Sequence, residues 1–378
     1  MTDFLFYGDT ERSAAMRHEL PVAIGDAFLL GVVGGRRHIV VNSLERGRVE
    51  AATPDAVLHD IADLGFHDLL QSGKRFFDID LELASRGAAA MGIREAVVDP
   101  EMPVAVADRL RADGLVLRPD DVPVAARRRV KTPAEIAGVR RAQAAAEAGM
   151  AAAAALLRSA DLEGERLVAA GEPVTAEAVR AVLREECRRH GAPAPPDVIV
   201  SSVWQGTGHD PGSGPLPANL PIVIDVWPQD EESACWGDMT RTFVVGEVSP
   251  AVRGLASLVG DALERARKAV RPGVLGRELH AIVCDVFEAA GHRTQRTGPG
   301  DDPEAGFQFS LGHGVGLAVH EAPSLGLAGV DALVAGDVVA MEPGLWVRGI
   351  GEVRFEDLLL VTGDGAETLN RYPFDLAP

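Results

Sequence analysis

Short apolar runs and amphipathic segments alternate along the first third of the chain. The runs at residues 26–33 and 38–43 are typical of two strands joined by a glycine pair. Residues 104–117 indicate a helix and then a short strand, separated by Gly114. Together these elements predict a small α/β unit over residues 1–125.

A long alanine-rich helix is predicted next. Thr132 is placed to cap it, Pro133 suits its first position, and Glu135 lies in the first turn. The alanine-rich pattern continues to residue 157. We expect the domain boundary just before this helix, which assigns residues 126–378 to a second and larger domain.

The second domain mixes amphipathic helices with short β-branched runs. Helices are predicted at 175–191, 249–270 and 274–292, and strands at 221–227, 240–246, 337–346 and 353–363. The order shows no regular strand–helix–strand repeat, which favours an α+β fold over a doubly wound sheet.

Composition narrows the choice of partners. Of the 378 residues 47% are apolar and 25% charged, so there is enough apolar material for a core. The 37 basic and 56 acidic side chains give a formal charge of −19. Because binding to phosphates requires clustered Lys and Arg, we expect no nucleic-acid partner and no anionic membrane partner.

The cysteine content indicates a reducing compartment. The three cysteines, Cys187, Cys235 and Cys284, are odd in number and none has CxxC spacing. The first residues lack the basic and apolar regions of a signal peptide, and no apolar run reaches the length of a membrane span. We therefore expect a cytoplasmic protein.

Four carboxylates lie inside or at the ends of the apolar runs. They are Asp225, Asp238, Glu342 and Glu356. A single acid of this kind is usually a solvated strand end, but burying an unpaired carboxylate costs several kcal/mol. Four of them with one nearby strand arginine, Arg354, indicate that metal ions supply the missing positive charge.

The charge count favours two ions. Four carboxylates match two divalent cations, and the neutral imidazole of His313 completes a set of five ligands. Oxygen donors with one nitrogen suit Mn, Fe, Co or Zn. Two such ions can activate a shared water molecule and polarise a substrate carbonyl.

The segments that carry these residues resemble one known family. "IDVW", "GDMTRTF", "SLGHGVGLAVHE", "AMEPG" and "VRFED" follow one another in the order seen in the M24 (pita-bread) dinuclear metallopeptidases. That family includes methionine aminopeptidase, aminopeptidase P, prolidase and the creatinase relatives. The resemblance covers residues 130–375 and implies a pita-bread catalytic domain. The N-terminal unit resembles the creatinase-type N-terminal domain.

The resemblance also implies roles for individual residues. The expected metal ligands are Asp225, Asp238, His313, Glu342 and Glu356. Among catalytic groups, His320 is expected to face the substrate and stabilise the tetrahedral intermediate. The alternative for His320 is a hydrogen-bonded core histidine.

Three further residues complete the catalytic set. His209 matches the family's second substrate-site histidine, with a surface-loop histidine as the alternative. Glu342 or its neighbour is expected to carry the proton. Arg354 precedes Glu356 by two residues, so both point to one strand face and the guanidinium can orient the carboxylate.

Several positions near the motifs bear on the choice of substrate. The Arg354–Glu356 spacing and the extra N-terminal domain resemble aminopeptidase P and prolidase. Trp227 stands where the family usually has glycine, and Phe309 replaces a histidine of many prolidases. Glu321 beside His320 is either a functional residue or a surface acid.

These inferences predict a metallopeptidase that hydrolyses N-terminal Xaa-Pro bonds in dipeptides or short peptides. The expected cofactors are two divalent ions per chain, with manganese first and cobalt, zinc or iron as alternatives. A peptide substrate and a homodimer are the expected partners. A metal-dependent non-peptidase hydrolase or lyase on the same scaffold, and a non-catalytic binding module, are the alternatives.

Overall fold

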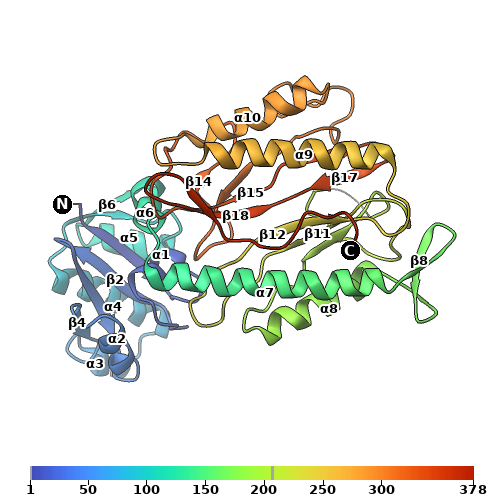
Figure 1. The fold of residues 1–378 in the computed structure, drawn as a ribbon. Coiled ribbons are helices and arrows are strands. Elements are labelled where there is room, and N and C mark those ends of the chain that lie inside the picture. Colours follow the sequence, from blue (N-terminus) through green and yellow to red (C-terminus); the bar gives the residue numbers. More distant parts are fainter. Residues whose placement is uncertain (1, 206–207) are drawn as a thin grey trace. The chain divides into compact units, whose positions relative to one another are not determined.

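The computed structural model describes residues 2–205 and 208–378 (Figure 1). The chain divides into two compact units, Met1–Arg128 and Arg129–Pro378. The assignment of residues 1–125 to the creatinase-type N-terminal domains and of 126–378 to the catalytic domain stays a prediction.

The first unit is built on a six-stranded sheet with the order β4-β3-β2-β1-β5-β6. Its strands are β1 (Phe4–Gly8), β2 (Phe28–Val33), β3 (Arg36–Val41), β4 (Val57–Asp60), β5 (Glu95–Val98) and β6 (Val116–Pro119). The predicted pair across the glycines is confirmed, since β2 and β3 run antiparallel with Val33 opposite Arg36. The pairs β1–β5, β5–β6 and β3–β4 are parallel.

Helices complete this unit through two separate apolar cores. They are α1 (Ala14–Glu19), α2 (Arg46–Ala52), α3 (Phe66–Gln71), α4 (Phe76–Met91), α5 (Val104–Ala112) and α6 (Asp121–Arg129). One core joins α4 and α5 to the sheet, and the other joins α1 and α2 to it. Successive side chains of the central strands point to opposite faces of the sheet, so each strand contributes buried residues to both cores.

In the second unit, one half packs two helices on an antiparallel sheet. The helices are α7 (Pro133–Arg158) and α8 (Ala176–Arg189), and the strands are β10 (Ile199–Ser201), β11 (Ile222–Val226) and β12 (Met239–Phe243). Their buried side chains form one core. The predicted start of α7 is confirmed, because Thr132 and Glu135 form a reciprocal capping box with Pro133 in the first turn.

The other half has the same plan. Helices α9 (Pro250–Ala269) and α10 (Gly276–Ala289) cover a five-stranded sheet and a hairpin (Figure 1). The sheet has the order β14-β13-β15-β18-β19, and the hairpin is β16–β17. Their bounds are β13 (Gly312–Gly314), β14 (Glu321–Ser324), β15 (Val338–Met341), β16 (Gly344–Val347), β17 (Gly351–Arg354), β18 (Asp357–Val361) and β19 (Ala366–Thr368).

A small separate sheet lies between α7 and α8 in sequence. It consists of β7 (Asp161–Glu163), β8 (Arg166–Ala169) and β9 (Glu172–Pro173). The mixed helix and sheet content confirms the predicted α+β class.

The prediction of two continuous strands at 337–346 and 353–363 is wrong. Each run is broken into two strands, with Glu342 and Glu356 in the breaks. At these two points the chain leaves the five-stranded sheet and enters the β16–β17 hairpin, or returns from it. The breaks therefore mark the two points where the chain changes sheets, and both carboxylates there are predicted ligands.

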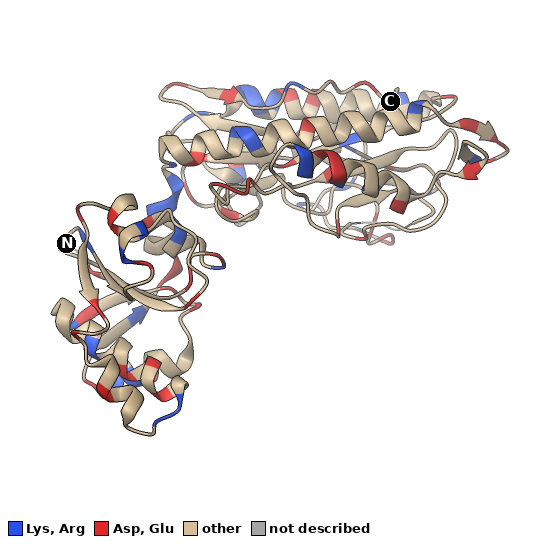
Figure 2. Cartoon of the chain, turned by 90° about the horizontal axis from the view of Figure 1, so that it is seen from below, with Lys and Arg blue, Asp and Glu red and all other residues tan. Residues whose placement is uncertain are grey.

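None of the helices among the described residues combines the length and apolar character needed to cross a membrane. Acidic and basic residues are interspersed along the ribbon of the second unit in the view of Figure 2.

Candidate active site

The eight predicted site residues come together around one cavity of about 350 Å³ in the second unit. They are His209, Asp225, Asp238, His313, His320, Glu342, Arg354 and Glu356. Trp227, Asp197 and Val319 complete the lining. Residues separated by more than a hundred positions in sequence therefore share one chamber.

The two aspartates are positioned by the antiparallel pair β11–β12. Asp225 lies opposite Thr240, and Asp238 immediately precedes β12. The backbone N–H of Asp238 donates to the side-chain oxygen of Gln143 on α7 at 3.1 Å. Both aspartates are buried, so the hairpin presents two carboxylates to the interior.

The two glutamates are held by backbone hydrogen bonds at the strand breaks. The N–H of Glu342 donates to the carbonyl of Leu311 at 2.8 Å, and that of Glu356 to the carbonyl of Thr240 at 3.1 Å. The Thr240 hydroxyl also donates to a Glu356 carboxylate oxygen at 2.8 Å. One residue of β12 thereby fixes both the backbone and the side chain of Glu356.

His313 on β13 is the predicted nitrogen donor of the ligand set. Its Nε2 lies 3.8 Å from Oδ2 of Asp238 and 3.8 Å from Oε1 of Glu342. Its Nδ1 lies 3.1 Å from the carbonyl of Gly314, which places the proton on Nδ1 and leaves the Nε2 lone pair free. Burial lowers the pKa of His313 to about 4, so the imidazole is neutral.

The donors are spaced for a metal ion. Ligand atoms of Asp238, His313 and Glu356 all lie within 4.8 Å of one another. The 3.8 Å separations from His313 exceed a hydrogen bond, yet two donors that each bind one ion at about 2.1 Å can be up to about 4.2 Å apart. The residues present therefore fit divalent cations of the kind that the M24 motifs imply.

The electrostatics point the same way. Burial raises the pKa of Glu342 to about 8, and burial with neighbouring carboxylates raises the pKa values of Asp238 and Glu356. Carboxyls in this state are protonated unless cations accompany them. Divalent cations at this cluster would keep these carboxyls ionised and able to act as ligands.

Arg354 is the one lysine or arginine among the described residues that line this cavity. Its Nη2 lies 3.0 Å from Asp225, its Nη1 3.5 Å from Glu342, and its Nε 3.7 Å from Glu352. Nε and Nη2 are buried without a hydrogen bond of good geometry. One guanidinium therefore faces several carboxylates and cannot neutralise them alone.

His320 lies against His313 and also borders a second cavity. Burial, followed by the nearby His209, lowers the pKa of His320. The second cavity, of about 480 Å³, is walled by Phe309 and Trp346 among others. His209 and His320 line both cavities, as do His313, Glu342 and Arg354, so the two cavities adjoin at these residues.

The loop that carries His209 is tied to α8. Arg180 donates from Nε to the carbonyl of Val198 at 2.7 Å and from Nη2 to the carbonyls of Pro211 and Gly212. Gly212 has φ +77°, and a Cβ there would lie 2.0 Å from the carbonyl oxygen of Val200. The exposed His209 is thus held on an anchored loop.

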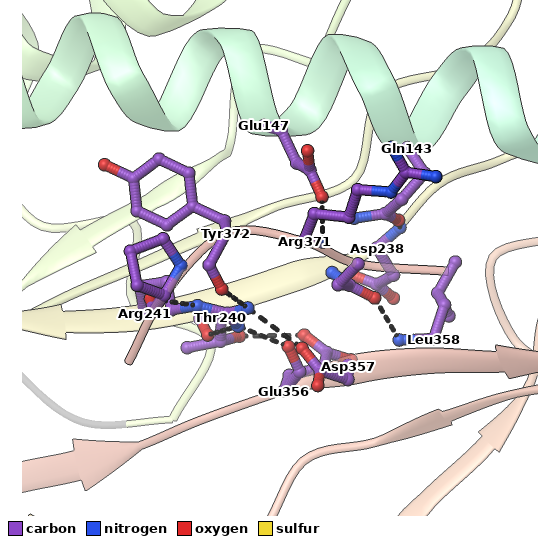
Figure 3. A network of polar contacts seen from close by, with 12 residues as sticks. Gln143, Glu147, Asp238, Thr240, Arg241, Glu356, Asp357, Leu358, Arg371 and Tyr372 are labelled. Atoms are coloured by element: carbon purple, nitrogen blue, oxygen red, sulfur yellow. Dashed lines mark hydrogen bonds and ion pairs between the residues drawn. The ribbon is translucent and has the colours of Figure 1, made fainter. Parts of the chain in front are cut away.

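Behind the predicted ligands, Arg241 connects two strands (Figure 3). The guanidinium is fully buried and donates to the carbonyls of Thr240 at 2.8 Å and Glu356 at 2.6 Å. It also pairs with Asp357 at 2.9 Å and donates to the carbonyl of Tyr372 at 2.7 Å. These bonds hold the β12 and β18 ends of the ligand set in register.

The surface-acid interpretation of Glu321 is wrong. Its side chain is 2% exposed and forms an ion pair with Lys131, whose side chain is also 2% exposed. In the loop between Asp225 and Asp238, the buried Asp230 pairs with the partly exposed Arg141 of α7 at 2.8 Å.

A family model describes most of this unit. Residues 137–363 match metallopeptidase family M24. The chain belongs to that family. The match includes every residue of the proposed ligand set, so M24 membership and the clustered donors both imply the use of divalent metal.

Relatives within M24 are named as peptidases. The chain is 37% identical over 134 residues to the Xaa-Pro dipeptidase of Pyrococcus furiosus, and 39% identical over 139 residues to the putative dipeptidase YkvY of Bacillus subtilis. Each match covers 35% of the relative and 35% or 37% of this chain. The aligned region thus spans about a third of the length of these curated relatives.

Solved structures show the same fold over the whole chain. The prolidase from Pyrococcus horikoshii has a TM-score of 0.77 at 21% identity, covering 100% of this chain and 95% of that one. The X-Pro aminopeptidase from Thermotoga maritima has a TM-score of 0.76 at 21% identity, covering 98% and 96%. The predicted pita-bread fold is confirmed.

Several residues at or near this site were not identified from the sequence. Glu352 precedes Arg354 by two residues, and side chains at that spacing point to the same face of a strand. This spacing could have identified Glu352 from the sequence. Lys131 is one of three lysines in a chain whose other basic residues are arginines, which was a weaker signal. For Arg180 and Asp197, no local pattern distinguishes them from surface charges.

Proposed function

We propose that this chain is a dinuclear metallopeptidase that hydrolyses N-terminal Xaa-Pro bonds in dipeptides or short peptides. The observation that carries the proposal is the shared cavity, in which a buried carboxylate–imidazole cluster lies beside two histidines. The name of the Pyrococcus furiosus relative, Xaa-Pro dipeptidase, supports this substrate class, and that of the Bacillus relative, a putative dipeptidase, supports a dipeptide substrate.

The proposed ligands are Asp225, Asp238, His313, Glu342 and Glu356. The four carboxylates carry the charge of two divalent cations, and we propose manganese first, with cobalt, zinc or iron as alternatives. When bound, the ions supply an activated water molecule and a positive charge that polarises the scissile carbonyl.

The remaining steps belong to side chains of the protein. Glu342 accepts a proton from the attacking water and passes it to the leaving proline nitrogen. His320 and His209 donate hydrogen bonds to the substrate and to the oxygen on which charge develops. Neutral imidazoles serve this purpose, and burial lowers the pKa of His320.

Arg354 has a positioning role in this scheme. Its guanidinium lies 3.0 Å from Asp225 and 3.5 Å from Glu342, so it orients two ligand carboxylates. The apolar walls at Phe309 and Trp346 suit the proline ring, whose amide has no N–H to offer a general peptidase site.

A direct assay tests the proposal. Protein incubated with Mn²⁺ is given Ala-Pro and Ala-Pro-Ala, with Ala-Ala and Ala-Ala-Ala as matched controls. Cleavage of the proline peptides with little cleavage of the controls is expected. Metal binding without any cleavage of the proline peptides would favour a metal-dependent non-peptidase, and absence of metal binding would favour a non-catalytic module.

A homodimer and a cytoplasmic location are also proposed. The three cysteines are free and buried, as expected of small apolar core residues in a reducing compartment. Sedimentation analysis of the full chain tests the dimer.

A further inference from the structure

We propose that the buried ion pair Lys131–Glu321 is a positioning device for His320, acting on the turn that presents this histidine to the substrate. The inference rests on the substrate-facing role proposed for His320. Neither Lys131 nor Glu321 is among the described residues that line the two cavities, so the pair acts on the reaction through neighbouring residues and not by contact with the substrate.

The pair is fully enclosed. The Lys131 ammonium contacts Oε1 of Glu321, and both side chains are 2% exposed. The other oxygen of Glu321 accepts a hydrogen bond from the N–H of Ala318 at 3.4 Å. The Glu321 carboxylate therefore bonds back to the backbone of Ala318, and the turn between these two residues contains His320.

The turn is built tightly around this pair. The N–H of Gly316 donates to the carbonyl of Ala318 at 3.1 Å, and the carbonyl of Gly316 accepts from Trp236 at 2.8 Å. A Cβ at Gly316 would lie 2.6 Å from Oε1 of Glu321 and 2.7 Å from Cε of Lys131. Only glycine leaves room for the ion pair, so the turn and the pair fit each other.

The backbone that carries Lys131 is held in place on both sides. The N–H of Lys131 donates to the carbonyl of Gly336 at 3.3 Å, and the next residue, Thr132, caps α7. The chain has three lysines among 37 basic residues, and this one is buried. A compact ammonium suits the space beside Gly316, which a wider guanidinium would overfill.

Stability alone is a weak reason for such a pair. Replacing both members of a buried ion pair by uncharged groups is often neutral or stabilising, whereas removing one member leaves a buried charge. Glu321 adjoins His320 directly, and the His320 ring lies 4.2 Å from the His313 ring. A shift of the turn therefore moves His320 relative to the metal ligands.

The test uses the double variant Lys131→Met/Glu321→Gln, which leaves no unpaired charge. The matched control is Arg129→Met/Asp337→Asn, which removes another ion pair of the same unit, with Asp337 fully buried. Both are compared with the full-length protein after Mn²⁺ loading. The measurements are bound metal, kcat and KM for Ala-Pro-Ala, and hydrogen exchange of peptide 314–322.

We expect the double variant to bind as much metal as the parent while its kcat falls about 10- to 100-fold. Exchange should accelerate in peptide 314–322, and the control should show neither effect. In a His320→Ala background, the same double substitution should lower kcat no further, because its effect passes through His320.

Two results would overturn the inference. One is unchanged exchange of peptide 314–322 together with unchanged kcat. The other is a full additional loss of kcat in the His320→Ala background, which would indicate a general structural role. If the parent protein cleaves no proline peptide, the proposed function fails on its own, and the exchange measurement alone then decides whether the pair holds the turn.

Discussion

The rings of His313 and His320 meet edge to face, with centroids 4.2 Å apart and an interplanar angle of 86°. The two histidines are seven residues apart in sequence and adjacent in space, yet their surroundings differ. Both line the two cavities, but Nε2 of His313 faces Asp238 and Glu342, whereas His320 has His209 nearby. The contact places a proposed metal ligand directly beside a proposed substrate contact.

Substitution of these two histidines should separate binding of metal from catalysis. His313→Ala removes the only nitrogen donor proposed for the ions, so bound metal and activity should fall together. His320→Ala removes a donor to the developing oxyanion, so kcat should fall about 10²- to 10³-fold with metal content unchanged. Metal analysis and steady-state kinetics of both variants check this, and loss of metal from His320→Ala would contradict the division of roles.

Removal of Arg354 should weaken the protein most when metal is absent. Arg354→Met removes the guanidinium that faces Asp225 and Glu342 in the cavity, and breaking a buried pair costs about 3–5 kcal/mol. Bound Mn²⁺ supplies compensating positive charge, so the loss of unfolding free energy should be smaller in its presence. Denaturant unfolding with and without chelator measures both values; an equal loss in the two states would argue against charge compensation.

The chelated protein should show an unusual dependence of stability on pH. Burial raises the pKa of Glu342 from 4.5 to about 8, so the folded metal-free protein holds a proton that the unfolded chain has released. The free energy of unfolding from this group is therefore greatest below about pH 4.5 and falls as pH rises towards about 8. Asp238 and Glu356, whose pKa values are also raised, act in the same direction.

Metal should reverse that trend. The gain in melting temperature on adding Mn²⁺ is expected to grow between about pH 5 and about pH 8, since the ions replace protons at the carboxylates. Thermal unfolding at a series of pH values, with Mn²⁺ or with chelator, gives the difference directly. A gain that stays constant over this range would mean that the carboxylates are not the metal ligands.

Substitution of Arg180 should lower kcat/KM for the substrate without changing the amount of bound metal. Arg180→Met removes the hydrogen bonds to the carbonyls of Val198, Pro211 and Gly212, which anchor the loop of His209. We expect kcat/KM for Ala-Pro-Ala to fall about tenfold or more, at constant bound metal. The exposed Arg188→Met on the same helix serves as control. Equal behaviour of the two variants would exclude anchoring of His209 by α8.

Much of the fold was accessible from local patterns. The capping box at Thr132 marks the start of α7, and the glycine pair at 34–35 marks a hairpin, because both signals depend on neighbouring residues alone. The breaks at Glu342 and Glu356 were not accessible. They arise where strands change sheets, and that change depends on pairing between segments distant in sequence.

The same distinction applies to the site. The four carboxylates among the proposed ligands could be identified because each one lies inside or at the end of an apolar run. That pattern can be recognised in each segment without knowing the fold. Arg180, Arg241 and Lys131 act on backbone carbonyls or on a carboxylate far along the chain. Their sequence neighbourhoods look like ordinary helix or strand surface, so only the folded arrangement reveals what they hold.

Titration of Mn²⁺ into fully chelated protein tests the central claim most directly, with bound metal and cleavage of Ala-Pro-Ala followed in the same samples. We predict no cleavage in the metal-free protein and a rise to a plateau as binding saturates at two ions per chain. Full cleavage by protein shown to be free of metal would contradict the account.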